Sequence, residues 1–157
     1  MEDCKRSQSV LLFYVENSLY MIPVKNIVTI TSIPERITHM PHSPEHVYGI
    51  CNIKGENFTL VDLNRLLKIP SSATIGEIGC QTVVALDCNI ALCVGEIIGV
   101  EPTGDLLFLQ NDMMTNHFIR NYYRPNETMW DYKFLKDKNE IAFELDIKQI
   151  KNFCQIN

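Results

Sequence analysis

Potential metal ligands gather in one segment of the first half of the chain, at His39, His42, His46 and Cys51. Imidazole and thiolate groups are the usual ligands of zinc. Structural zinc sites, however, use characteristic close pairs of Cys or His. Here Pro41 and Pro44 interrupt the segment, so His42 and His46 do not share a regular helix face. We therefore favour a solvated loop over a metal site, and we expect neither a metal nor another cofactor.

Catalysis by a nucleophile would need an activated Cys or Ser beside a base. Cys51 lies within Gly49-Ile50-Cys51-Asn52-Ile53, where nothing indicates a lowered thiol pKa. The sequence also lacks the G-x-S-x-G, H-E-x-x-H and P-loop patterns. We expect no enzyme activity and no catalytic residues. A small metal- or thiol-dependent enzyme built on the three histidines and Cys51 is the remote alternative.

The most unusual local pattern runs from Gly49 to Asp62. Gly49 and Gly55 bracket one apolar run, and Lys54 stands next to the second glycine. We expect a hairpin with its turn at 54–57, where Gly55 can take a positive φ. Asp62 stands where an N-cap would, ahead of a short amphipathic helix at 63–67. On their own, these features indicate structure rather than function.

Short apolar runs rich in β-branched residues recur along the whole chain, with turn residues between them. We expect strands at 10–15, 19–22, 27–33, 47–53, 58–61, 82–87, 90–94, 96–101, 118–124, 129–135 and 141–145. Asp146 is expected to cap a final helix at 147–153. The polar, glycine-bearing stretch 70–79 is expected to connect two halves of one domain. Many short strands at this spacing favour small barrels.

Composition narrows the class of partner. The chain has 157 residues, which fits one domain, and a net charge of −5 with no basic block, which argues against nucleic acid. No run approaches the roughly 20 apolar residues that a membrane helix needs, so we expect no membrane insertion. The polar residues 1–8 are expected to be flexible, and we do not expect them to be a signal peptide. Six scattered cysteines without a C-x-x-C pair indicate free thiols in a reducing cytoplasm.

The segment from Gly49 to Leu63 resembles the hallmark of the CheW-like family. That hallmark reads Gly, two apolar residues, Asn-Leu-Arg-Gly, an apolar strand and Asp-Leu. This chain has Gly49-Ile50-Cys51-Asn52-Ile53-Lys54-Gly55 and then Leu60-Val61-Asp62-Leu63. Upstream, Tyr20–Ile27 and Met40-Pro41 are also similar to the family. The likeness is specific over residues 9–70 and looser beyond, where Gly95 stands in place of the family's usual Asp.

The resemblance implies a fold of two small five-stranded SH3-like barrels packed together, mainly β with short helices. It implies a single CheW-like domain over residues 1–157, with one barrel at about 27–80 and the other formed by 9–26 plus 81–157. It also implies a non-catalytic chemotaxis adaptor that couples chemoreceptors to a CheA-type histidine kinase. The expected partners are the regulatory domain of that kinase and the cytoplasmic tip of a chemoreceptor.

The resemblance also assigns roles to individual residues. Apolar receptor contacts in a groove are carried over to Ile27, Ile30, Ile97 and Val100. Lys54 and Gly55 correspond to the hairpin tip that is tied to receptor–kinase coupling, while Gly49, Asn52 and Asp62 belong to the structural motif. Lys54 replaces the family's Arg, so the charge is kept but a bidentate contact would be lost. A divergent module that serves another histidine-kinase pathway, or competes with the main adaptor, is the alternative.

Overall fold

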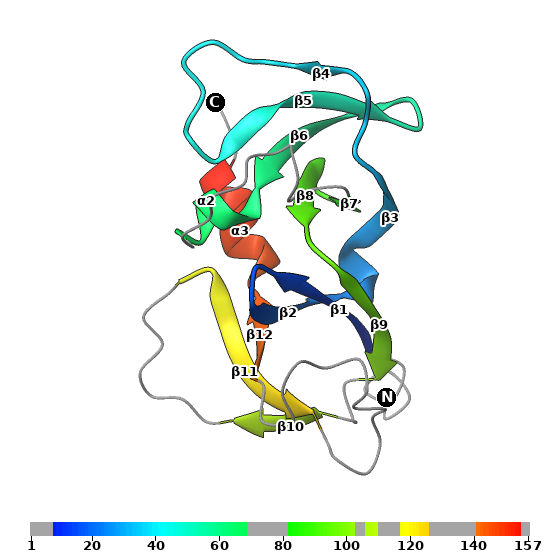
Figure 1. The fold of residues 1–157 in the computed structure, drawn as a ribbon, viewed down its shortest axis with the longest axis vertical. Helices are drawn as coiled ribbons and strands as arrows, with labels where there is room; N and C mark the ends of the chain where they lie inside the picture. Colours follow the sequence, from blue (N-terminus) through cyan, green and yellow to red (C-terminus); the bar gives the residue numbers. More distant parts are fainter. Residues whose placement is uncertain (1–7, 69–81, 103–105, 110–116, 126–140, 155–157) are drawn as a thin grey trace. The chain divides into compact units, whose positions relative to one another are not determined.

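The computed structural model describes residues 8–68, 82–102, 106–109, 117–125 and 141–154. The chain forms two compact units, each assembled from segments that are distant in the sequence. Unit 1 comprises residues 1–26 and 97–150, and unit 2 comprises residues 27–96 and 151–157. Each unit contains a six-stranded sheet, and the strands are labelled in Figure 1.

The sheet of unit 1 has the strand order β10-β11-β12-β2-β1-β9. Its strands are β1 (Ser9–Val15), β2 (Ser18–Pro23), β9 (Ile97–Pro102), β10 (Leu106–Leu109), β11 (Ile119–Pro125) and β12 (Ala142–Leu145). All side chains from Val10 to Val15 are buried, which explains why β1 is a continuous apolar run in the sequence. On one face of β1, Leu12 and Tyr14 form a core with Met21 of β2 and Ala142 of β12.

The sheet of unit 2 has the strand order β3-β7-β8-β6-β5-β4. Its strands are β3 (Ile27–Ser32), β4 (Ile37–Thr38), β5 (Val47–Ile53), β6 (Glu56–Asp62), β7 (Thr82–Leu86) and β8 (Ile90–Val94). Alternate residues of β5, among them Cys51 and Ile53, face a core that includes Phe58, Leu60 and Val83. The period of two along β5 is the pattern of a strand with one buried face.

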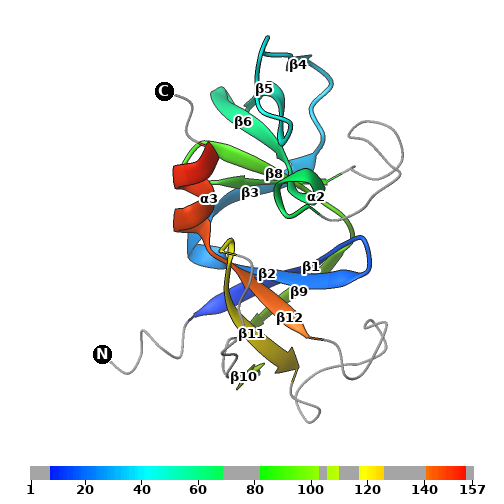
Figure 2. The same cartoon turned by 90° about the vertical axis from the view of Figure 1, so that its left-hand side faces the viewer.

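The helical segments are short, as the sequence analysis predicts. A 3-10 turn, η1 (Val24–Asn26), joins β2 to β3, and α2 (Leu63–Leu66) follows β6. Helix α3 (Ile147–Cys154) continues directly from β12, as Figure 2 shows. The Asp146 side chain accepts a hydrogen bond from Gln149 N at 3.1 Å, which confirms the predicted cap of this helix.

The structure confirms the mainly β fold class with short helices. It also has one strand more per sheet than the five expected, because the sequence analysis missed β4 and β10. The predicted strand at 129–135 and the predicted connection at 70–79 lie outside the described residues. In each sheet the pairing runs as an open row of strands.

The expected division between barrels needs a correction at residue 81. The β7–β8 hairpin pairs with strands of unit 2, with Ile30 opposite Val84 and Thr59 opposite Ile90, although the sequence analysis placed it in the other barrel. The chain therefore changes unit after Asn26 and again after Glu96. The composition of an apolar hairpin does not tell which of two sheets it joins, so the sequence carries little signal for this boundary.

Candidate functional site

The tip of the β5–β6 hairpin is a two-residue turn, shorter than the predicted four residues. Asn52 lies opposite Asn57 and Ile53 opposite Glu56, which leaves Lys54 and Gly55 as the turn. Their φ angles are 51° and 87°, the pattern of a type I′ turn that fits the twist of a hairpin. Glycine adopts this conformation freely, whereas Lys54 does so at some conformational cost. The turn holds the Lys54 side chain exposed at the tip.

The side chain of Asn52 stabilises this turn from within the hairpin. Its Oδ1 accepts a hydrogen bond from the Gly55 backbone N–H at 3.1 Å. Its Nδ2 donates to Oδ1 of Asn57 on the opposite strand at 3.3 Å. A short side chain that both accepts and donates is needed for this double role, so the residue type at position 52 follows from the turn geometry.

Gly49 is required by the close approach of β4 to β5. A Cβ atom at this position would lie 2.5 Å from the Thr38 carbonyl oxygen and 2.8 Å from Cγ2 of Ile37. Real Cβ atoms essentially never come within 3.0 Å of a heavy atom outside their own and the adjacent residues. Gly49 therefore allows the short strand β4 to pair with β5, and its role in the motif is packing.

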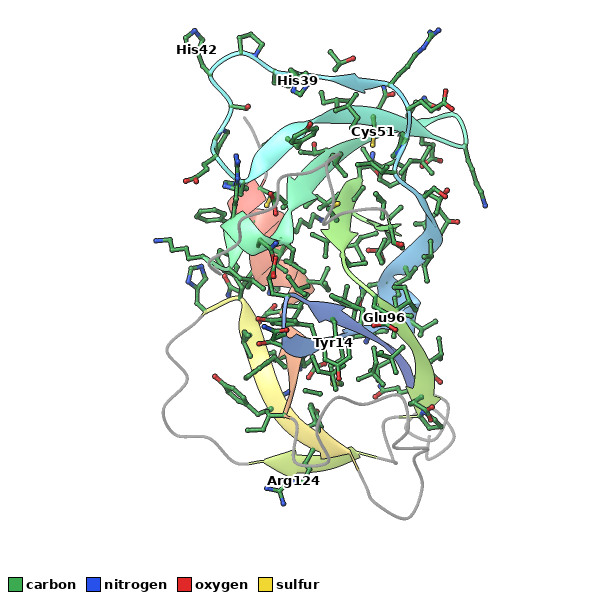
Figure 3. The ribbon with its side chains drawn as sticks, viewed as in Figure 1. Tyr14, His39, His42, Cys51, Glu96 and Arg124 are labelled. Carbon is green, nitrogen blue, oxygen red and sulfur yellow. The ribbon has the colours of Figure 1, made fainter. Side chains whose placement is uncertain are left out.

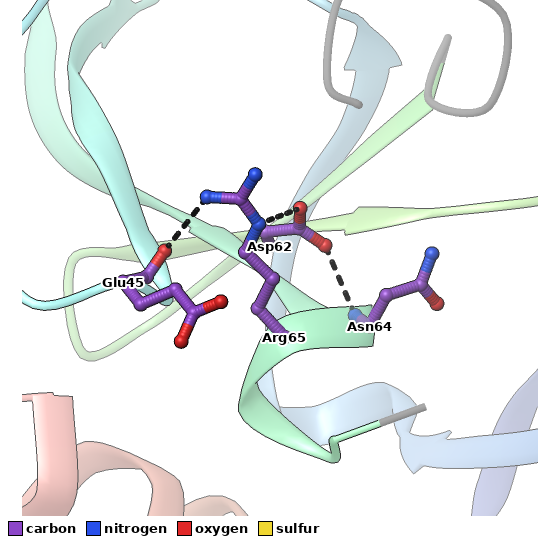
Figure 4. A network of polar contacts seen from close by, with 4 residues as sticks. All are labelled: Glu45, Asp62, Asn64 and Arg65. Carbon is purple, nitrogen blue, oxygen red and sulfur yellow. Dashed lines mark hydrogen bonds and ion pairs between the residues drawn. The ribbon is translucent and has the colours of Figure 1, made fainter. Parts of the chain in front are cut away.

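Asp62 links the end of β6 to the segment before β5 (Figure 4). Its Oδ1 accepts a hydrogen bond from Asn64 N at 3.0 Å and so caps α2, as predicted. Its Oδ2 lies 3.6 Å from Nε of Arg65, and the Arg65 guanidinium donates to the carbonyl oxygen of Glu45 at 3.3 Å. The Asp62 backbone N–H donates to the carbonyl oxygen of His46 at 2.8 Å. These contacts fix the loop that leads into β5.

Exposed apolar side chains lie on edge strand β3 of unit 2. Ile30 is 42% exposed and Val28 is 55% exposed. A register shift between Ile27 and Thr29 marks a bulge at Val28, a common way of modifying an edge strand. Ile27 is only partly buried. The sequence analysis did not select Val28, although the alternation along 27–32 places it in phase with Ile30.

Unit 1 also presents an apolar residue on an edge strand. Val100 of β9 is 55% exposed, whereas Ile97, at the start of the same strand, is partly buried. A register shift between Leu12 and Phe13 of β1 places Ile97 opposite Phe13 and Val100 opposite Leu11. Each of the four predicted groove residues is therefore on an edge strand of its own sheet, two in each unit.

The histidines and Cys51 do not form a metal site. His39 and His42 lie on the segment before β5, and Cys51 lies on β5 itself (Figure 3). Nδ1 of His39 is 3.1 Å from the Tyr48 carbonyl oxygen, and His46 packs its ring against Phe153. Among the described residues, no three His, Cys, Asp or Glu side chains are grouped so that they could hold a metal ion.

The cysteines of the described segments have little nucleophilic character. Cys51, Cys88 and Cys154 carry free thiols. Burial raises the pKa of the Cys51 and Cys88 thiols, and burial together with nearby Cys88 raises the pKa of Cys154 to about 11. These thiols are protonated at neutral pH and are poor nucleophiles. Cys93 is disulfide-bonded, so the expectation of free thiols is wrong at this position.

Contiguous apolar side chains exposed on a protein surface mark sites of interaction with other proteins in many structures. A sequence model of the CheW-like domain matches residues 9–130. The chain belongs to the CheW-like family.

A comparison with solved structures agrees with this fold. The structure is similar to the crystal structure of the scaffolding protein TtCheW from Thermoanaerobacter tengcongensis, with a TM-score of 0.66 and 15% sequence identity. The match covers 88% of each chain. Among curated proteins, none matches the sequence significantly. No helix in the described parts of the chain is both long enough and apolar enough to cross a membrane.

Proposed function

We propose that this chain is a non-catalytic cytoplasmic adaptor that couples chemoreceptors to a CheA-type histidine kinase. The observation that carries the proposal is the CheW-like domain match over residues 9–130. The structure supports it with exposed apolar residues on edge strands and with thiols that are protonated at neutral pH. The proposed partners are the regulatory domain of the kinase and the cytoplasmic tip of a chemoreceptor.

In this proposal, Ile27 and Ile30 of β3 and Ile97 and Val100 of β9 contact apolar side chains of the receptor tip. Val28 joins this set because it is as exposed as Val100. Burying a Val or Ile side chain contributes about 1.5–3 kcal/mol when burial is complete, so a few such residues can anchor a partner of moderate affinity. Lys54, at the exposed turn, supplies the cation that couples receptor to kinase, with Gly55 setting the geometry of its backbone.

The proposal is tested by placing a negative charge on the edge strand β3. We expect Ile30→Glu to weaken binding of a receptor signalling fragment at least about tenfold, because a carboxylate would have to be desolvated at the interface. Thr38→Glu is the matched control, since it adds the same charge at an exposed position on the opposite edge of the same sheet. Binding is measured by calorimetry, and coupling by kinase activation in a reconstituted ternary mixture.

Two outcomes would count against the proposal. If neither the receptor fragment nor the kinase regulatory domain binds at tens of micromolar, the adaptor role is wrong. If both bind but Ile30→Glu and Thr38→Glu behave alike, the receptor does not use β3.

Lys54 in place of the family's Arg favours a second candidate function. A lysine keeps the charge but offers no planar pair of donors, so receptor–kinase coupling could differ from that of the main adaptor. The chain would then serve another histidine-kinase pathway, or compete with the main adaptor for the same receptor. Adding the purified chain to a working receptor–kinase–adaptor mixture distinguishes these functions. A competitor lowers kinase activity, whereas a coupling adaptor maintains it.

A further inference from the structure

His46 is a buried histidine at a junction of unit 2. It is the residue before β5, and its side chain is only 8% exposed. Its ring packs against that of Phe153 in the last turn of α3, with centroids 4.9 Å apart. Phe153 itself is 52% exposed, so the aromatic ring that contacts the imidazole lies at the surface. The ring pair thus connects the loop before β5 to the end of α3.

The backbone carbonyl and the side-chain Nε2 of His46 differ in their hydrogen bonding. Its carbonyl oxygen accepts a hydrogen bond from Asp62 N at 2.8 Å, which fixes the backbone. Its Nε2 atom is buried and has no hydrogen-bond partner among the described residues. A neutral imidazole can leave one nitrogen as an unused acceptor at modest cost, but an imidazolium has two N–H donors and a charge to satisfy. The site therefore accommodates the neutral ring and not the cation.

The charges around His46 do not compensate for this burial. The charged neighbour on its own turn is Glu45, which favours the imidazolium. Where β6 passes into α2, the Asp62 carboxylate is already bound to Arg65 and Asn64 N, and α3 carries Lys151 in the same turn as Phe153. Burial is the larger effect and lowers the pKa of His46, while Glu45 opposes it.

We propose that His46 is a pH-sensitive latch, in which protonation expels the imidazole from beneath Phe153 and releases the last turn of α3. The sign follows from the direction of the pKa shift. The His46 imidazole has a lower pKa in the folded chain than the ordinary 6.5. The contribution of the buried neutral ring to stability is therefore complete above pH 6.5. The contribution is lost as the pH falls through the lower folded pKa. This inference is independent of any receptor or kinase.

The test is amide hydrogen exchange of the whole chain at about pH 7.5 and about pH 5, corrected for intrinsic exchange. We expect the amides of 151–154 to lose protection by a factor on the order of three or more at the lower pH, relative to amides of β8. His46→Phe keeps an aromatic ring against Phe153 and removes the titrating group, so the loss should disappear. His42→Ala removes an exposed histidine of the same loop and should preserve the loss.

A second measurement covers the case in which His46→Phe does not fold. In the wild-type chain, the ring protons of His46 should titrate below the ordinary histidine pKa of 6.5. The proposal is overturned if His46 titrates at pH 6.5 or above. It is also overturned if protection of 151–154 does not fall, falls equally in β8, or falls unchanged in a folded His46→Phe variant.

Discussion

Replacing Gly49 by alanine isolates a single steric contact of the family motif. The added Cβ atom would lie 2.5 Å from the Thr38 carbonyl oxygen and 2.8 Å from Cγ2 of Ile37. A side chain could rotate away, but a backbone carbonyl cannot move without displacing its strand. Because β4 has only two residues, we expect it to separate from β5 while the rest of the sheet persists.

The expected cost is about 2 kcal/mol, within the range of about 1–3 kcal/mol for an extra methyl group in a well-packed site. At a urea dependence of about 2 kcal/mol per molar, this cost moves the unfolding midpoint down by about 1 M. The thermal midpoint should fall by about 4–8 °C for a chain of this length. Circular dichroism during urea and thermal unfolding measures both shifts.

Two further variants decide whether contact with the Thr38 carbonyl oxygen causes the loss of stability in Gly49→Ala. Gly55→Ala adds a methyl group with nothing within 4 Å, so its cost is only the strain of alanine at a φ of 87°, on the order of 1 kcal/mol. Ile37→Ala removes the Cγ2 contact but leaves the carbonyl in place, so it should not rescue Gly49→Ala. Full rescue by Ile37→Ala, or a Gly49→Ala variant as stable as the wild type, would refute the reasoning.

Two other positions of the motif give separate predictions. Lys54→Arg should leave the free energy of unfolding, measured in urea, within about 0.5 kcal/mol of wild type, because both residues meet the same positive φ. It should raise kinase activation by restoring a bidentate donor, and an unchanged activation would show that the planar fork is not used. Asp62→Ala should lower the free energy of unfolding by about 1–2 kcal/mol, because it removes the cap of α2. Asp62→Asn should lower it less, because the amide carbonyl can still accept from Asn64 N. Equal losses in the two variants would contradict the capping role.

Local features of the fold could be predicted because their causes lie within a few residues. Asp62 and Asp146 both precede short helices, and in each case the side chain accepts from a backbone N–H two or three residues later. The apolar run 10–15 predicts a buried strand, and β1 has every one of those side chains buried. These predictions depend on a side-chain acceptor before a helix and on a continuous apolar run, both of which can be read from the sequence.

Features that depend on distant partners could not be predicted in the same way. Strand β4, Ile37–Thr38, is too short to show a period of two in the sequence. Its pairing with Ile50 and Cys51 of β5 is seen only in the structure. The β7–β8 hairpin could join either sheet, because both offer apolar edges. His46 appeared as one of three loop histidines, and the sequence does not show that its ring packs against Phe153, more than a hundred residues later.

The residues of the family motif include three that stabilise the fold of unit 2 and one, Lys54, whose side chain the fold does not use. Gly49 avoids a clash, Asn52 binds the turn backbone, and Asp62 caps a helix, so each is needed for the fold of unit 2 itself. Lys54 is constrained only by its positive φ, and its side chain extends from an exposed turn. Substitution of Lys54 should therefore disturb the fold less than substitution of any of the first three residues. In the proposed adaptor, the exchange of the family's Arg for Lys therefore falls at a position where coupling can change without a change in the fold.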